Sequence, residues 1–343
     1  MRALEDDMIL ALMALGWSQR FVLRLIHLAR SSYYYRQHPR PPKPDPIPHT
    51  QRAYPNRLDE AETNTIVEAL ETSKVSVEQT YHRLFNAGVY TASLSTFYRL
   101  ARRHKLRLPA TRSRRLGGVK TTPITPRATA KKVGDVLCWD ISYLPGLYKH
   151  RGFMLYTVID LYSRYICAFT VQPRQDQTVA VDLMREAIET VPGPVGTIHC
   201  DNGAVMRSNK MAEFLQDQGI AQSFIRPGVS NDNAFMESFY RTLKYGPKYP
   251  GSFEDINTAY EWVAEFIEAY NTTHCHGGLN GYTPQDVFHG TWPLAWRKRQ
   301  AALDAAYQAH PARYKHPPTA TRPPATARIN QATPHPLTTL TTQ

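Results

Sequence analysis

The sequence predicts an α/β core preceded by all-α helical units. Residues 5–36 and 58–105 carry one-sided helical patterns, whereas residues 136–225 alternate β-branched and aromatic runs with helical patterns. The chain has 343 residues, of which 42% are hydrophobic. This length and composition favour about two domains with buried cores and exclude a wholly disordered chain.

The net charge of +12 is unevenly distributed. Residues 1–132 carry +13 and residues 294–343 carry +6, whereas residues 133–293 carry −7. The stretch 101–132 alone has 11 basic residues and no acidic residue. Basic flanks around an acidic middle favour a protein that binds a polyanion such as nucleic acid and uses carboxylates at its centre. An ordinary acidic domain between solvated linkers is the alternative.

The sequence indicates neither secretion nor a membrane partner. No apolar run approaches the ~18 residues of a membrane span, and the N-terminus lacks a small-residue cleavage site. The four cysteines are far apart and form no CxxC pair. These features favour a reduced, cytoplasmic setting.

Two helical units are expected before the core. Residues 1–38 predict three short helices with tight turns, a helix-turn-helix-like DNA-binding unit. Residues 58–105 predict a second helix-turn-helix DNA-binding domain, with Ser76 as an N-cap. Its last helix ends in basic residues that we expect to contact DNA, namely Arg102, Arg103 and Lys105. A helical packing module with a solvated charged face is the alternative interpretation.

Three other segments have no regular pattern or only a short one. Residues 39–57, with six prolines between Pro39 and Pro48, predict a Pro-rich linker. Residues 106–133 predict a basic linker that lies along a phosphate backbone. Its expected DNA-binding residues are Arg107, Arg114 and Arg115. Residues 293–343 predict a basic helix followed by a disordered tail rich in proline and threonine.

Residues 134–292 predict the α/β core. Its strand-like segments are 136–142, 153–160, 164–171, 196–200 and 221–225. The first three strands are consecutive, and helices and strands alternate after them. This order predicts a mixed five-stranded sheet covered by helices, as in a ribonuclease-H-like fold.

Three acidic residues occupy positions where active sites form. Asp140 ends the strand-like run VLCWD, Asp201 directly follows GTIHC, and Glu237 lies in the expected helix 233–245. Strand ends meet at the rim of a sheet, where sites in α/β folds gather. Clustered carboxylates need a cation and suit Mg²⁺, which assists phosphodiester chemistry. For one acid taken alone, a capping role is more common.

Five segments resemble the integrase core of bacterial insertion-sequence transposases. This type is usually encoded by the second of two overlapping reading frames and belongs to the DDE superfamily shared with retroviral integrases. The segments are WDIS (139–142), VIDLYSRYI (158–166), HCDNG (199–203), DNAFMESFYRTLK (232–244) and YNTTHCHGGLNGYTPQDVF (270–288). Between Asp201 and Glu237 lie 35 residues, a spacing typical of this family. The resemblance covers residues 134–290 and implies a DDE integrase core, and residues 58–105 resemble the helix-turn-helix that precedes it.

The resemblance implies that Asp140, Asp201 and Glu237 are catalytic and bind two Mg²⁺ or Mn²⁺ ions per active site. Lys244 lies seven residues after Glu237, so both point from one face of a helix, and Lys244 is placed to hold a phosphate. Further DNA contacts are expected at Asn233, on that face, and at Arg241.

Some residues invite other interpretations. Asp160 is a rival first acid, but the family pattern makes it structural support, with Arg164 as its ion-pair or turn partner. Cys200 stands where the family often has serine. His274, Cys275 and His276 lack a second pair of metal ligands, so we interpret them as loop residues near DNA or as core packing.

The implied function is a DNA transposase. It would bind the terminal inverted repeats of an insertion sequence and catalyse metal-dependent strand cleavage and strand transfer in DNA integration and recombination. Its partners would be double-stranded element-end and target DNA, further copies of itself in a dimer or larger assembly, and an upstream-frame product. The alternatives are a catalytically inert domesticated DNA-binding regulator and another ribonuclease-H-like nuclease.

Overall fold

The computed structural model describes residues 2–39, 45, 48, 54–106, 128–148, 150–225 and 233–329. The chain separates into two compact units, Met1–Tyr54 and Pro55–Gln343. Within the described ranges, no helix is both long and apolar enough to cross a membrane.

The first unit contains three short helices, as expected for residues 1–38. They are α1 (Arg2–Ala14), α2 (Gln19–Leu25) and α3 (Arg30–Gln37). Ile9, Val22 and Tyr33, one from each helix, are buried together. The Arg36 guanidinium of α3 also donates to the Glu5 carboxylate of α1 at 2.9 Å.

The second unit begins with another three-helix domain. Its helices are α4 (Glu60–Thr72), α5 (Val77–Asn86) and α6 (Leu94–Arg103). The Ser76 hydroxyl accepts a hydrogen bond from the Gln79 amide, so Ser76 is the N-cap that the sequence predicts. Ile66, Leu70 and Phe97 belong to the buried core of this domain.

A mixed five-stranded sheet follows, which confirms the predicted fold class. Its strands are β2 (Val136–Pro145), β3 (Gly152–Asp160), β4 (Ile166–Gln172), β5 (Thr197–Cys200) and β6 (Ala221–Phe224). The spatial order is β4-β3-β2-β5-β6. β2, β3 and β4 pair antiparallel, whereas β5 runs parallel to β2 and β6 runs parallel to β5.

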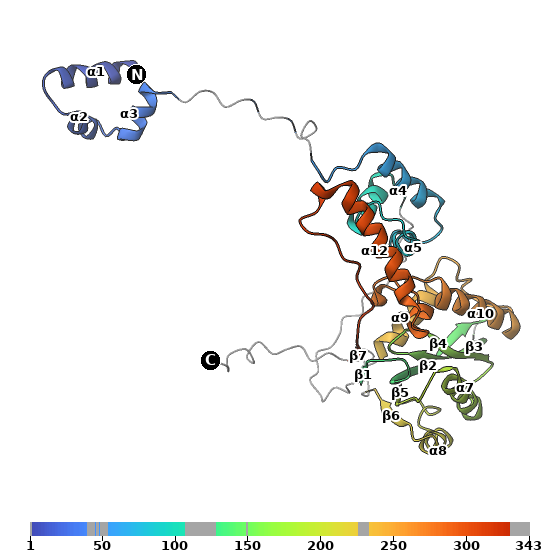
Figure 1. Ribbon diagram of the computed structural model, residues 1–343. Coiled ribbons are helices and arrows are strands. Elements are labelled where there is room, and N and C mark those ends of the chain that lie inside the picture. The colour runs from blue at the N-terminus through green and yellow to red at the C-terminus, as the bar shows by residue number, and fades with distance from the viewer. Residues whose placement is uncertain are drawn as a thin grey trace. The chain divides into compact units, whose positions relative to one another are not determined.

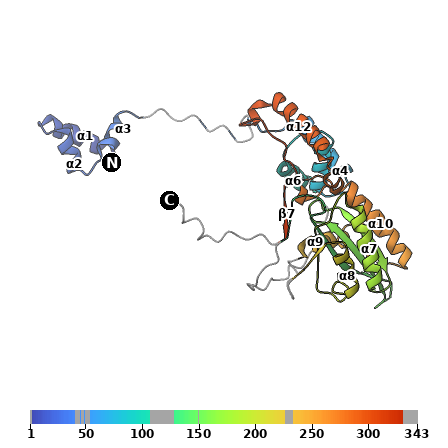
Figure 2. The ribbon, with the colours of Figure 1, turned by 60° about the horizontal axis from the view of Figure 1, so that its bottom comes forward.

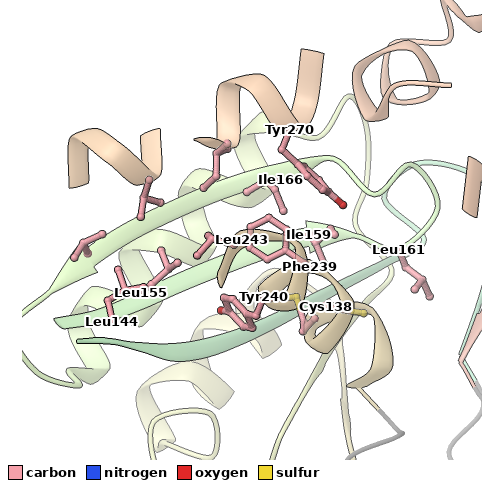
Figure 3. Close-up of a cluster of buried hydrophobic side chains, with 14 of the residues drawn as sticks. Cys138, Leu144, Leu155, Ile159, Leu161, Ile166, Phe239, Tyr240, Leu243 and Tyr270 are labelled. Atoms are coloured by element: carbon pink, nitrogen blue, oxygen red, sulfur yellow. The ribbon is translucent and has the colours of Figure 1, made fainter. Parts of the chain in front are cut away.

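Two helical layers cover the sheet (Figure 1). They are formed by α7 (Gln177–Thr190) with α8 (Asn209–Asp217), and by α9 (Ala234–Lys244) with α10 (Ile256–Thr272). Successive strand residues face opposite layers. On β2, Leu137 and Trp139 pack in the cluster that contains α7, whereas Cys138 packs in the cluster that contains α9. Figure 3 shows Phe239, Tyr240 and Leu243 of α9 beside the strands.

The C-terminal segment is more ordered than the sequence predicts. After α11 (Pro284–Phe288) and α12 (Trp292–Ala309) come the turn η3 (Pro311–Arg313) and the strand β7 (Ala327–Ile329). β7 pairs antiparallel with β1 (Ala128–Ala130), and the Trp296 indole donates to the Ala320 carbonyl at 2.9 Å. A disordered tail is therefore wrong for residues 311–329, because distant parts of the chain supply its partners. Residues 330–343 lie outside the described residues.

The second helical domain packs on this C-terminal segment, with α5 beside α12 (Figure 1), and Figure 2 shows α4 and α6 of this domain next to α12. Arg299 of α12 is fully buried. It donates to Asn86 Oδ1 of α5 at 2.6 Å and lies over the Tyr282 ring, 3.8 Å from its centroid. Gln79 exchanges two hydrogen bonds with the Cys275 backbone, at 2.6 and 2.9 Å. Residues 58–105 thus form one compact body with the core.

Candidate active site

Asp140 lies on the central strand β2, on the face that α9 covers. Two residues before it, Cys138 packs with α9, and side chains two positions apart on a strand share a face. One carboxylate oxygen accepts the Ile141 amide at 2.8 Å. Burial, together with the smaller effect of the nearby Asp201 and Glu237 carboxylates, raises the pKa of Asp140 to about 7.

Asp201 follows β5, the strand parallel to β2. The register pairs Cys138 with His199, so its continuation by two residues places Asp201 next to Asp140. The Gly203 amide donates to Asp201 Oδ1 at 2.8 Å. A Cβ at residue 203 would lie 2.9 Å from the same oxygen, so the turn favours glycine there.

Glu237 lies in the first turn of α9 and is exposed. The buried side chains of Met236, Phe239 and Leu243 hold α9 against the sheet. The Tyr240 hydroxyl also donates to the backbone carbonyl of Asp140 at 2.9 Å. Residues three apart on a helix are neighbours, so this contact keeps Glu237 near Asp140.

The donor set of this acidic site consists of carboxylate oxygens, which suit hard cations such as Mg²⁺. Burial is the main cause of the raised pKa of Asp140, and the negative charges of Asp201 and Glu237 add to it. A cation between them would relieve this repulsion. In the part of the chain that the structure describes, no three such side chains are yet close enough to hold one metal ion.

Lys244 lies two turns after Glu237 on α9, as expected, and contacts β2. Its ammonium donates to Ser142 Oγ at 2.7 Å and to the Tyr143 carbonyl at 2.8 Å. Burial lowers the pKa of Lys244, and the charge of Asp140 opposes this effect. Lys244 is therefore a cation held at the edge of the acidic site.

The other residues predicted to contact DNA differ in their exposure to solvent. Asn233 is the N-cap of α9 and only 5% exposed, so it does not lie on the open helix face that we expected. Arg241 is exposed in the last turn of α9. Arg102, Arg103 and Lys105 are exposed at the end of α6. Arg107, Arg114 and Arg115 lie outside the described residues.

Asp160 does not belong to the acidic site. It is fully buried at the end of β3 and accepts hydrogen bonds from the amides of Gly134 and Ser163 and from the Ser163 hydroxyl. Burial raises its pKa. The Arg164 amide donates to the Asp160 carbonyl at 2.8 Å, so Arg164 is its turn partner. These contacts agree with the structural role that we expected.

The His274–His276 segment packs between the core and the second helical domain. His274 stacks on Tyr270, Cys275 bonds through its backbone to Gln79, and His276 Nδ1 accepts the Gly278 amide. Burial lowers the pKa of His274 to about 4. Core packing is therefore the better of the two sequence interpretations.

The sequence did not reveal the contacts that position this site. The bonds of Ser142 to Lys244 and of Tyr240 to Asp140 join residues about 100 positions apart, and no local pattern encodes such pairs. The sequence did contain one indication of the Ser142 contact, namely the spacing of Ser142 from Asp140. Ser142 lies two residues after Asp140 on a strand, so it faces the same helix.

Comparison with known proteins identifies this part of the chain. Two family models, both described as integrase core domain, match residues 130–230 and 218–284. Residues 130–284 are therefore similar to integrase core domains. The matched ranges contain Asp140, Asp201, Glu237 and Lys244.

The integrase core domain is similar to insertion-sequence transposases. The transposase for element IS904 of Lactococcus lactis is 33% identical over 149 residues, which are 43% of this chain and 58% of the relative. A putative transposase for IS150 of Escherichia coli is 29% identical over 41% of this chain and 50% of the relative. The transposase for IS3A of Escherichia coli is 27% identical over 59% of this chain and 70% of the relative. The chain spans a little over half the length of the first two relatives.

Solved retroviral proteins show weaker similarity. The HTLV-2 integrase catalytic core domain in complex with magnesium has a TM-score of 0.36 and 16% identity, covering 46% of this chain and 98% of that chain. The simian T-cell lymphotropic virus intasome has a TM-score of 0.39 and 16% identity, and the match covers 58% of this chain and 67% of that chain.

Proposed function

We propose that this protein is a DNA transposase that cuts and joins strands at the ends of an insertion sequence. One observation carries the proposal. Asp140 lies on the central strand β2, Asp201 directly follows the neighbouring strand β5, and Glu237 is near enough to contribute to the raised pKa of Asp140. Similarity to transposases for IS904 and IS3A supports the same reaction.

Asp140, Asp201 and Glu237 would hold divalent cations, Mg²⁺ or Mn²⁺, two in each active site. Bound there, such ions activate an attacking oxygen and stabilise the leaving one in an in-line displacement at phosphorus. Because the pKa of Asp140 is about 7, this carboxyl keeps a proton through much of the neutral range. It would lose that proton when a cation takes its place.

The surrounding residues would position DNA. Lys244 already lies beside Asp140 as a cation, and its hydrogen bonds to β2 can be exchanged for a phosphate oxygen. The Tyr240 hydroxyl holds α9, and with it Glu237, against β2. Correct placement of the substrate supplies much of the rate enhancement in phosphoryl transfer, and this chain contributes mainly placement and charge.

The helical domains would recognise the element ends as double-stranded DNA in the cytoplasm. The exposed basic end of α6, with Arg102 and Arg103, suits contact with phosphates. Two ends must meet before they are joined, so a dimer or larger assembly on DNA is part of the proposal. An upstream-frame product is a further proposed partner.

The test is cleavage of a labelled element end by the purified protein with Mg²⁺ or Mn²⁺. Asp140→Asn, Asp201→Asn and Glu237→Gln should each abolish cleavage and strand transfer while end binding persists. An active Glu237→Gln protein would overturn the assignment. Binding of ends without cleavage by the wild type would favour a catalytically inert domesticated regulator, and cleavage of RNA–DNA hybrids would favour another ribonuclease-H-like nuclease.

A further inference from the structure

A cavity of about 270 Å³ lies at the N-terminal end of α9, apart from the acidic site. Its walls include Arg164, which follows the Asp160 turn, and Phe235 and Ser238 from the first turns of α9. His276 lines it as well. The mechanism proposed above uses none of these side chains.

Arg164 is a buried cation whose hydrogen bonds are not satisfied. The residue is 7% exposed. Its Nε and Nη1 atoms have no hydrogen-bond partner among the described residues. The nearby Asp160 carboxylate is already occupied by donors from Gly134 and Ser163. The Phe235 ring, with its centroid 4.0 Å from Arg164 Cζ, offers the guanidinium only a π face. Burial removes water from the Arg164 guanidinium and thereby lowers its pKa.

The other polar groups of the cavity are also donors. His276 Nδ1 accepts the Gly278 amide at 3.0 Å, which places the ring proton on Nε2. Burial, with Arg164 nearby, lowers the pKa of His276 to about 3, so this ring is neutral at pH 7. The first turn of α9, an 11-residue helix, carries amides without helical acceptors and the positive end of the helix dipole. Among the described residues that line the cavity, none is a carboxylate.

We infer that this cavity binds one phosphate group through the unsatisfied Arg164 guanidinium, the Ser238 hydroxyl and the N-terminal end of α9. A tetrahedral anion suits a buried arginine fork facing a helix N-terminus. The inference deepens the proposed function and rests on DNA being the substrate. The phosphate is a backbone phosphodiester of the element end, because Phe235 and Ser238 flank Glu237 on the same helix. A strand that occupies the cavity is therefore held within one helical turn of the acidic site.

The test scans an element-end duplex with single methylphosphonate substitutions, each of which removes one backbone charge. Binding to the full-length protein is measured without divalent cations. For the wild type, we expect one substitution near the cut to weaken binding by about tenfold to a hundredfold. Arg164→Gln should bind the unmodified end that much more weakly and lose no further affinity with that substitution. Arg185→Gln, which removes an exposed arginine of α7, should keep the wild-type profile.

A second variant covers the case in which Arg164→Gln does not fold. Ser238 is exposed, so its substitution leaves the core intact. Ser238→Asp should place a carboxylate by Arg164, raise the thermal midpoint and remove sensitivity to the same methylphosphonate. Ser238→Thr, which keeps the hydroxyl and adds no charge, is the control and should retain that sensitivity. A wild-type profile for Ser238→Asp would overturn the inference.

Free inorganic phosphate is the other source of this ligand. If phosphate, compared with chloride at equal ionic strength, raises the thermal midpoint of the wild type but not of Ser238→Asp, and the DNA scan is flat, the cavity takes free phosphate and the DNA assignment fails. If neither experiment responds, there is no phosphate site. Neither readout requires cleavage, so a protein that binds DNA without cutting it would refute the proposed function and leave this inference standing.

Discussion

The Tyr240 hydroxyl donates a hydrogen bond to the Asp140 carbonyl at 2.9 Å and so joins α9 to β2. The two elements carry Glu237 and Asp140, and the sheet hydrogen bonds alone do not connect them. The buried faces of α9 set its distance from the sheet, whereas this bond sets its position along the strand.

Removal of that bond should therefore affect catalysis more than folding. Tyr240→Phe should lower the rate of metal-dependent end cleavage by about tenfold or more, with a loss of about 1 kcal/mol in the free energy of unfolding. Cleavage kinetics and denaturant unfolding measure the two effects. Tyr260→Phe, which removes a hydroxyl from an exposed ring stacked on Phe169, is the control and should change neither. Equal cleavage rates for both variants would contradict a positioning role.

The raised pKa of Asp140 predicts a pH-dependent cost of folding. In the folded protein this pKa is about 7, above its ordinary value of 3.8, so Asp140 favours the folded state fully below pH 3.8 and this contribution is lost as the pH rises through 7. Without divalent cations, Asp140→Asn should match the wild type near pH 4 and exceed its stability by at most about 4 kcal/mol at pH 8. Thermal unfolding across this range measures the difference. Added Mg²⁺ should stabilise the wild type alone, and a constant difference at all pH values would refute the shift.

Lys244 should exchange its contacts with β2 for a DNA phosphate. Lys244→Gln should reduce the slope of log affinity against log salt by about one, and it should weaken binding to all sequences equally. Filter binding to element-end and unrelated duplexes at several salt concentrations measures both properties. Lys210→Gln removes an exposed cation of α8 that bonds to Thr178, and it should leave the slope unchanged. An unchanged slope for Lys244→Gln would mean that Lys244 serves only to hold β2.

Arg299 should be necessary for the packing of the second helical domain against the core. Arg299→Met should lower the free energy of unfolding by about 2–4 kcal/mol, because the part-buried Asn86 Oδ1 and the Asn280 carbonyl lose their donor and the fully buried guanidinium loses its packing. Arg299→Lys should not restore stability, since lysine lacks the planar fork that lies over Tyr282. Urea unfolding measures the loss, and Arg297→Met on the exposed side of α12 is the control. A wild-type midpoint for Arg299→Met would contradict this role.

Local patterns predicted the fold well. Strand alternation located β2 and β3, and the hydroxyl of Ser76 marked the start of α5, because these features depend on neighbouring residues. Asp140 was predicted to end its strand, but β2 continues to Pro145 and Asp140 lies in its middle. Asp201 follows β5 as predicted, and extending the β2–β5 register by two residues pairs it with Asp140. Their roles, and those of the other predicted site residues, stay predictions.

Features that depend on distant partners were not predicted. Residues 327–329 look like part of a Pro/Thr-rich tail, yet they form β7 because β1 provides their backbone partners. Arg299 resembles the exposed Arg297 in sequence, and only the packing of Asn86 and Tyr282 around it distinguishes the two. Asn233 was expected to share a helix face with Glu237, whereas it lies at the N-cap position of α9 and is buried.

The contact between Glu62 and Arg313 has a consequence for synthesis. The Arg313 guanidinium donates to both carboxylate oxygens of Glu62, at 2.6 and 2.9 Å, although 251 positions separate the two residues. A growing chain cannot make this contact until the ribosome has translated residue 313 and that residue has left the exit tunnel. A polypeptide that ends before residue 313 would therefore carry the three helices α4, α5 and α6 without this ion pair.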